Sequence, residues 1–115
     1  MQVFNADGSF VYGIHGSTSD GSDLQSPWGV AFDPSGNLHV ANHGSGCVKI
    51  FTAEGKYVTQ YGSDTLRTPA GIAIDEEGYS FVAEYYYVDK GSSRNGMLKI
   101  LQPHHQYCYV LFVLC

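Results

Sequence analysis

Short apolar runs alternate with turn residues through the middle of the chain, at the spacing of about 8–12 residues that is typical of antiparallel strands. Four such runs predict four consecutive strands of one sheet. They cover Trp28–Asp33, Leu38–Asn42, Cys47–Thr52 and Tyr57–Tyr61. No stretch has a sustained 3.6-residue pattern, and the 14 glycines disfavour long helices. The sequence therefore predicts an all-β fold.

Acidic residues followed by glycine separate the first two strands of each predicted sheet. Asp33-Pro-Ser-Gly36 and Asp75-Glu-Glu-Gly78 place a hydrogen-bond acceptor at the first turn position and glycine where a positive φ is needed. Because local hydrogen bonding of Asp accounts for such residues, Asp33 and Asp75 are interpreted as turn residues and not as catalytic or metal-binding groups.

The chain also repeats itself. Residues 24–41 coincide with residues 66–83 at Leu, Pro, Gly, Ala, Asp, Gly, Val and Ala when shifted by 42 positions. Residues 3–11 resemble residues 50–58 at a shift of 47, and a third copy begins at residues 97–101. A unit of about 40–45 residues with four strands is typical of a β-propeller blade.

The repeats predict the organisation of the chain. Residues 1–23 form the end of a preceding blade and an inter-blade link, 24–65 a complete blade, 66–101 a second, incomplete blade, and 102–115 an apolar tail that departs from the repeat. The tail is either the foreign end of a truncated or spliced product or a real outer strand over Tyr107–Leu114. Since propellers typically have four to eight blades, we expect a fragment that self-associates when isolated.

The repeated pattern Pro-x-Gly-[Val/Ile]-Ala-x-Asp-x-x-Gly-x-x-x-Val-Ala, followed by a Val-Lys-Ile-Phe strand, resembles the NHL repeat. Phe51–Gly62 and Val82-Ala-Glu-Tyr85 are similar to phrases in the C-terminal NHL propellers of tripartite-motif ubiquitin ligases. The resemblance implies a partial, open β-propeller of antiparallel four-stranded NHL blades. The chain departs from the family at Asn42 and Glu84, where Asp is usual, and lacks the Arg that usually precedes the third strand.

Composition narrows the classes of partner. Six Lys and Arg against 11 Asp and Glu give a net charge of −5, which opposes binding to phosphate backbones. The longest apolar run, Tyr107–Cys115, is far shorter than the roughly 20 residues of a membrane helix, so no membrane partner is expected. Three cysteines without a CxxC pair fit a reducing, cytoplasmic location.

No catalytic, metal-binding or cofactor-binding site is predicted. His39 and His43 do not share a face of a strand and have no third ligand nearby. The polar link Asp20–Asp23 lacks the further ligands of a calcium loop and is expected to be flexible. The chain has no G-x-S-x-G, P-loop or dinucleotide-binding motif.

The topology of an up-and-down sheet gathers candidate binding residues at one rim, because the second connection and the inter-blade links lie opposite the first and third connections. This rim carries residues 42–46, the links 16–27 and 62–69, and an enlarged loop expected over 84–96. Loops on rigid scaffolds commonly carry recognition, and Tyr and Arg are enriched at binding hot spots. The candidate partner-binding residues are His43, Arg67, Tyr85, Tyr86, Tyr87, Lys90 and Arg94.

These observations predict a recognition module with a protein partner. The resemblance implies a fragment or relative of a tripartite-motif ubiquitin ligase that selects substrates, although three cysteines cannot build the zinc sites of a RING domain. One alternative is single-stranded RNA binding in post-transcriptional regulation, disfavoured by the acidic charge. A second is an enzyme of the amidating-lyase type, for which the sequence offers no cluster of metal ligands.

Overall fold

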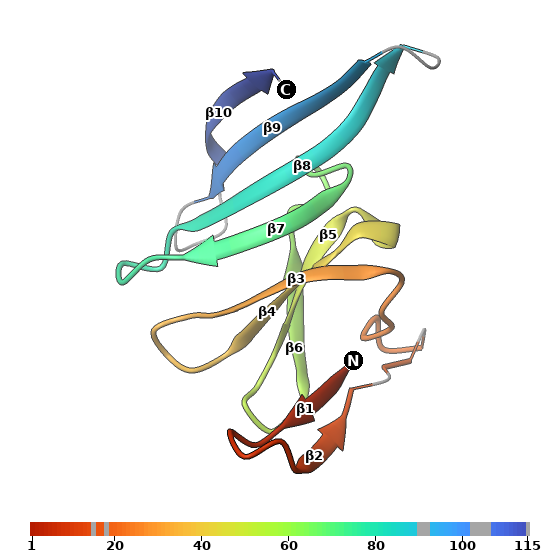
Figure 1. The fold of residues 1–115 in the computed structure, drawn as a ribbon, viewed down its shortest axis with the longest axis vertical. Coiled ribbons are helices and arrows are strands. Elements are labelled where there is room, and N and C mark those ends of the chain that lie inside the picture. Colours follow the sequence, from red (N-terminus) through yellow and green to blue (C-terminus); the bar gives the residue numbers. More distant parts are fainter. Residues whose placement is uncertain (15, 18, 90–92, 102–106, 115) are drawn as a thin grey trace.

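The computed structural model describes residues 1–14, 16–17, 19–89, 93–101 and 107–114, and for residues 85–89, 93–97 and 107–114 the description is confined to the backbone. Within these ranges strands form three antiparallel sheets and there is no α-helix (Figure 1). The elements in chain order are β1 Gln2–Phe4, β2 Phe10–Gly13, β3 Pro27–Phe32, β4 Leu38–Asn42, the 3₁₀ turn η1 His43–Ser45, β5 Cys47–Phe51, β6 Tyr57–Tyr61, β7 Pro69–Ile74, β8 Ser80–Asp89, β9 Ser93–Leu101 and β10 Tyr107–Leu114.

Each four-stranded sheet is built from strands that follow one another in the chain. The first contains β3-β4-β5-β6, the second contains β7-β8-β9-β10 in the same consecutive order, and β1 pairs with β2 alone. The all-β prediction is confirmed, and the architecture is that of a partial β-propeller. The four strands predicted between residues 28 and 61 are confirmed, with ends that differ by at most one residue.

The turns between the first two strands of each blade have the predicted chemistry. The Gly36 N–H donates to the Asp33 carbonyl at 3.0 Å, and the Gly78 N–H donates to the Asp75 carbonyl at 3.1 Å. Both glycines have positive φ, 86° and 90°, a conformation that costs other residues more. The predicted turns at Asp33–Gly36 and Asp75–Gly78 are therefore confirmed.

Blade packing produces two apolar clusters on either side of the first four-stranded sheet. On one side Val48, Ile50 and Tyr61 pack with Val82 and Leu101 of the second blade. On the other side the buried side chains are Ile14, Leu38, Val40 and Phe51. Because both faces of β5 are covered, all five of its residues are buried.

The two blades approach most closely where β3 lies beside β7. A Cβ atom added at Gly29 would lie 2.3 Å from the carbonyl oxygen of Ala70, which is well inside contact distance. The glycine of the Pro-x-Gly pattern is thus explained by backbone approach between neighbouring blades.

The structure decides the conformation of two segments, the described part of residues 84–96 and residues 107–114. The enlarged loop expected over residues 84–96 is wrong in conformation, because β8 and β9 continue as a paired ribbon in which Tyr87 lies opposite Arg94. Tyr and Val favour extended backbone, and the run Tyr85–Val88 consists of these two residue types. For the tail, the structure has Tyr107–Leu114 as the outer strand β10, paired antiparallel with β9.

Candidate interaction rim

The 3₁₀ turn after β4 packs against both inter-blade links. The His43 N–H donates to the Ser26 carbonyl at 3.2 Å, and the Gly44 N–H donates to the Gln25 carbonyl at 2.7 Å. On the other side, a Cβ atom added at Gly46 would lie 3.0 Å from the carbonyl oxygen of Arg67. The structure therefore brings the backbones at His43 and Arg67, two of the predicted site residues, to the same rim.

A buried acceptor at the end of the second strand of each blade fixes the link that leads into that blade. The Asn42 Oδ1 atom accepts a hydrogen bond from the Gln25 N–H at 2.7 Å. In the equivalent position of the second blade, Glu84 Oε2 accepts from the N–H groups of Arg67 at 2.6 Å and Thr68 at 3.0 Å. Asn and Glu thus both supply the acceptor at the position where the resembling family usually has Asp.

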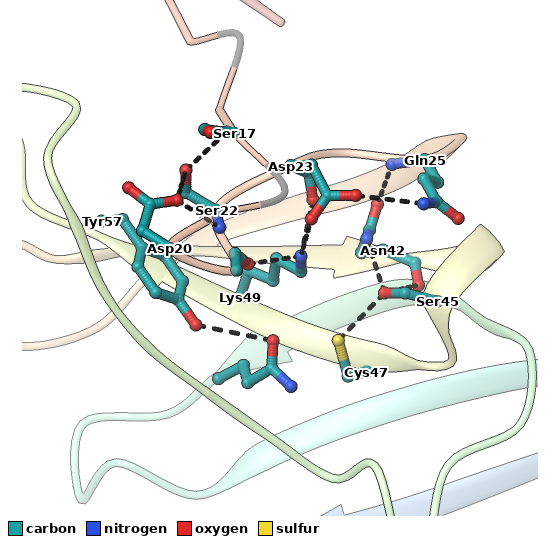
Figure 2. Close-up of polar contacts among 12 residues, drawn as sticks. Ser17, Asp20, Ser22, Asp23, Gln25, Asn42, Ser45, Cys47, Lys49 and Tyr57 are labelled. Atoms are coloured by element: carbon teal, nitrogen blue, oxygen red, sulfur yellow. Dashed lines mark hydrogen bonds and ion pairs between the residues drawn. The ribbon is translucent and has the colours of Figure 1, made fainter.

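A buried lysine from the third strand of each blade holds the same links, and Figure 2 shows the one in the first blade, Lys49, beside Asp23. Lys49 Nζ donates to the carbonyls of Gly21 and Asp23, both at 2.6 Å, and pairs with Asp23 Oδ1 at 3.2 Å. Lys99 Nζ, its counterpart, donates to the Thr65 carbonyl and pairs with Glu84 Oε1 at 2.6 Å. The link expected to be flexible is therefore held at a defined position.

The charge on Lys49 also acts on the link carboxylate. Its hydrogen bond to Asp23, followed by that from Gln25, lowers the pKa of the Asp23 carboxyl below its usual range. Asp23 therefore stays ionised at neutral pH and neutralises a lysine whose side chain is only 3% exposed. This pairing explains how a cation is kept inside the blade.

An aromatic stack lies where the rim meets the inner strand. The rings of Trp28 and His43 are 4.3 Å apart and 6° from parallel. Trp28 is nonetheless 58% exposed, so its ring offers apolar area to solvent. Of the two, only His43 was predicted as a binding residue. Trp28 occupies the variable second position of the Pro-x-Gly pattern, and this position was the signal that could have identified it.

Four of the remaining predicted site residues lie on the ribbon formed by β8 and β9, namely Tyr85, Tyr86, Tyr87 and Arg94. Strand β7 pairs with β8 only as far as Glu84, and beyond this point β8 pairs with β9 alone. The ribbon projects past the end of β7 in Figure 1. In its register Tyr85, Tyr86 and Tyr87 lie opposite Gly96, Asn95 and Arg94. Lys90 lies outside the described residues.

A buried polar chain, which the sequence analysis missed, crosses between the two blades. His39 Nε2 lies 2.8 Å from Asp33 Oδ2, and His39 Nδ1 lies 2.8 Å from the Tyr61 hydroxyl. The Tyr61 hydroxyl lies 3.0 Å from Ser80 Oγ of the second blade. His39 thus joins the Asp33 carboxylate to the Tyr61 hydroxyl, and Tyr61 joins His39 to Ser80 of the second blade.

Two members of this polar chain, Tyr61 and Asp33, have shifted pKa values. Burial raises the pKa of Tyr61 well above its usual range, so the phenol remains a donor. Burial also acts to raise the pKa of Asp33, but the hydrogen bonds from His39 and from the Asn37 and Ser35 N–H groups outweigh it and leave the pKa lowered. Three of its members are at most 6% exposed, and the polar chain connects the two blades.

The lowered pKa of Asp33 predicts a pH dependence of folding. A carboxyl whose folded-state pKa is depressed contributes stability that is fully present above its unfolded pKa of about 3.9 and is lost as the pH falls below it. We expect Asp33→Asn to reduce the slope of unfolding free energy against pH below about pH 4. Urea unfolding across this range checks it. Asp75→Asn is the matched control. Asp75 has the place of Asp33 in the second blade, but Phe81 has the place of His39, so Asp75 has no histidine partner at that position. Equal slopes in the two variants would contradict the prediction.

No metal site is found in the part of the chain that the structure describes: no three His, Cys, Asp or Glu side chains gather there. Across the same residues we find no helix with the length and apolar character needed to cross a bilayer.

The chain is similar to two viral proteins, and part of it matches a repeat family. The chain is 42% identical over 92 residues to "Uncharacterized protein L690" of Acanthamoeba polyphaga mimivirus, covering 75% of this chain and 22% of that protein. It is 30% identical over 92 residues to "Uncharacterized protein R648" of the same virus, covering 75% of this chain and 21% of that protein. The chain thus spans about a fifth of the length of the relatives it matches. Residues 24–51 match the model of the NHL repeat, so the blade formed by β3 to β6 contains an NHL repeat.

Proposed function

We propose that the chain is a protein-recognition module whose binding surface is the rim formed by η1, the link at Arg67 and the ribbon of β8 and β9. NHL repeats commonly form propellers that mediate protein–protein interaction, which supports a protein partner. The observation that carries the proposal is the ribbon, which extends beyond the strand pairing of the second blade and bears three consecutive tyrosines with an arginine opposite. Tyr and Arg are enriched at interface hot spots.

The residues that hold the inter-blade links make the rim suitable for recognition. The links are fixed by Asn42, Glu84 and two buried lysines, so the rim is a rigid support for the ribbon. Rigid supports lower the entropic cost of binding. On the resemblance to tripartite-motif proteins, we extend the proposal to substrate selection for ubiquitination in the cytoplasm, with ubiquitin transfer supplied by a part outside these 115 residues.

Site-specific photo-crosslinking tests the proposal. A photoreactive residue is placed at position 86 on the ribbon, and a control at the exposed Glu54 in the turn between β5 and β6, on the opposite rim. We expect protein adducts that resist nuclease at position 86 and not at position 54. The adducts identify the partner for binding measurements.

Substitution of the ribbon then measures its contribution. We expect Tyr86→Ala or Arg94→Ala to weaken binding of the identified partner by about 30-fold, the equivalent of a hot spot of about 2 kcal/mol. Glu54→Ala should leave the affinity unchanged. Nuclease-sensitive adducts, together with oligonucleotide binding that falls steeply with salt, would overturn the protein partner and make RNA the ligand.

A further inference from the structure

The inner strand β3 exposes a strip of large apolar side chains. Trp28, Val30 and Phe32 alternate along one face of the strand and are 58%, 53% and 63% exposed. The neighbouring strands β4 and β5 are covered on this side, where Leu38, Val40 and Phe51 pack with Ile14 of the segment that follows β2. The strip is thus the uncovered inner part of a face whose outer part is buried.

In the second blade the equivalent strip packs on the inner strand of the first blade. The repeat places Ala70, Ile72 and Ile74 of β7 at the positions of Trp28, Val30 and Phe32. There β7 lies against β3 and β4, Ile72 joins the core between the blades, and Gly29 allows the backbone of β3 to approach Ala70. By the same packing, the strip on β3 fits an inner strand that has glycine at the position of Gly29.

A free strand edge accompanies the strip. The sequence of β1 and β2 repeats that of β5 and β6, the third and fourth strands of the next blade. In that blade β5 pairs with β4 on one side and with β6 on the other. Strand β1 pairs only with β2 among the described residues, so its other edge is free where a second strand of a blade would pair.

We propose that Trp28, Val30 and Phe32, together with the free edge of β1, form a docking surface for a two-stranded β-hairpin of the Pro-x-Gly-x-Ala type. The hairpin's first strand would cover the strip with its glycine at the Trp28 backbone, and its second strand would pair with β1. The partner is a hairpin contributed from outside these 115 residues. A second copy does not fit, because its hairpins continue into third and fourth strands that would occupy the place of β1 and β2.

The only tryptophan of the chain is Trp28, so its fluorescence reports on this surface directly. The probe is a synthetic peptide of residues 66–84, which has the required pattern and no tryptophan, titrated into the full chain. We expect a saturable shift of Trp28 emission to shorter wavelength and slower hydrogen exchange of the β1 amides. The control peptide carries Gly71→Ala, which adds a Cβ where the two backbones must meet.

Each result decides for or against the docking surface. The Gly71→Ala peptide and the full-chain variant Val30→Lys, which changes an exposed residue, should each bind at least about tenfold more weakly. No shift at saturating peptide, or equal binding of the control peptide, would overturn the proposal. So would a Trp28 emission that shifts with protein concentration alone, because a second copy would then cover the strip.

Discussion

Glu84→Ala is expected to lower the free energy of unfolding by about 3–5 kcal/mol, the typical loss when one partner of a buried ion pair is removed. The Glu84 side chain is fully buried and pairs with Lys99, which is itself only 11% exposed. The substitution leaves that cation without its carboxylate and removes the acceptor of the Arg67 and Thr68 N–H groups. Since domains are stable by about 5–15 kcal/mol, this is a large part of the total stability.

Chemical unfolding of matched variants separates the two roles of Glu84. Glu84→Gln keeps an acceptor oxygen but not the charge, and should lose less stability than Glu84→Ala. Glu76→Ala, an exposed change in the turn between β7 and β8, should stay within about 0.5 kcal/mol of the parent chain. A Glu84→Ala chain as stable as the Glu76→Ala control would show that the link is held by other contacts.

Gly29→Ala is expected to lower the free energy of unfolding, because it disturbs the packing between the two blades. The added Cβ would lie 2.3 Å from the Ala70 carbonyl oxygen, and a backbone atom cannot rotate away as a side chain can. Overpacking in well-packed interiors costs about 1–3 kcal/mol, and we expect a value at the upper end of this range. Thermal or urea unfolding measures the loss.

The repeat supplies a matched control for this change. Gly71 has the same place in the second blade, but a Cβ added there meets only the Ala83 Cβ at 3.7 Å, an ordinary contact. Gly71→Ala should therefore leave stability unchanged or raise it by up to about 1 kcal/mol, because alanine restricts the unfolded chain. Equal losses in the two variants would show that backbone approach between β3 and β7 is not the cause.

The strands that were predicted correctly are those whose signals are local. Leu38–Asn42 has exactly the predicted bounds, because an apolar run and its flanking turn residues define such a strand within a few positions. The conformation of residues 84–96 was predicted wrongly, because extra length was taken as a loop although Tyr and Val favour strands.

The polar interior could not be predicted in the same way. Asn42 and Glu84 accept hydrogen bonds from residues 17 positions away, and the chain from Asp33 to Ser80 joins two different blades. Such contacts depend on how blades stack, which no local pattern encodes. Asn42 and Glu84 occupy the same place in the repeat, where the resembling family usually has Asp, and this signal identified the two positions without their role.

The two links differ in length, yet they are held at the same points. Residues 14–26 connect β2 to β3 and the shorter segment 62–68 connects β6 to β7, while Lys49 and Lys99 bind the equivalent carbonyls of Asp23 and Thr65. The final residues of each link are therefore anchored whatever precedes them. Insertions before Asp23 or Thr65 can change the outline of the rim without altering the angle between blades, which lets this scaffold vary its loops in evolution at little cost in stability.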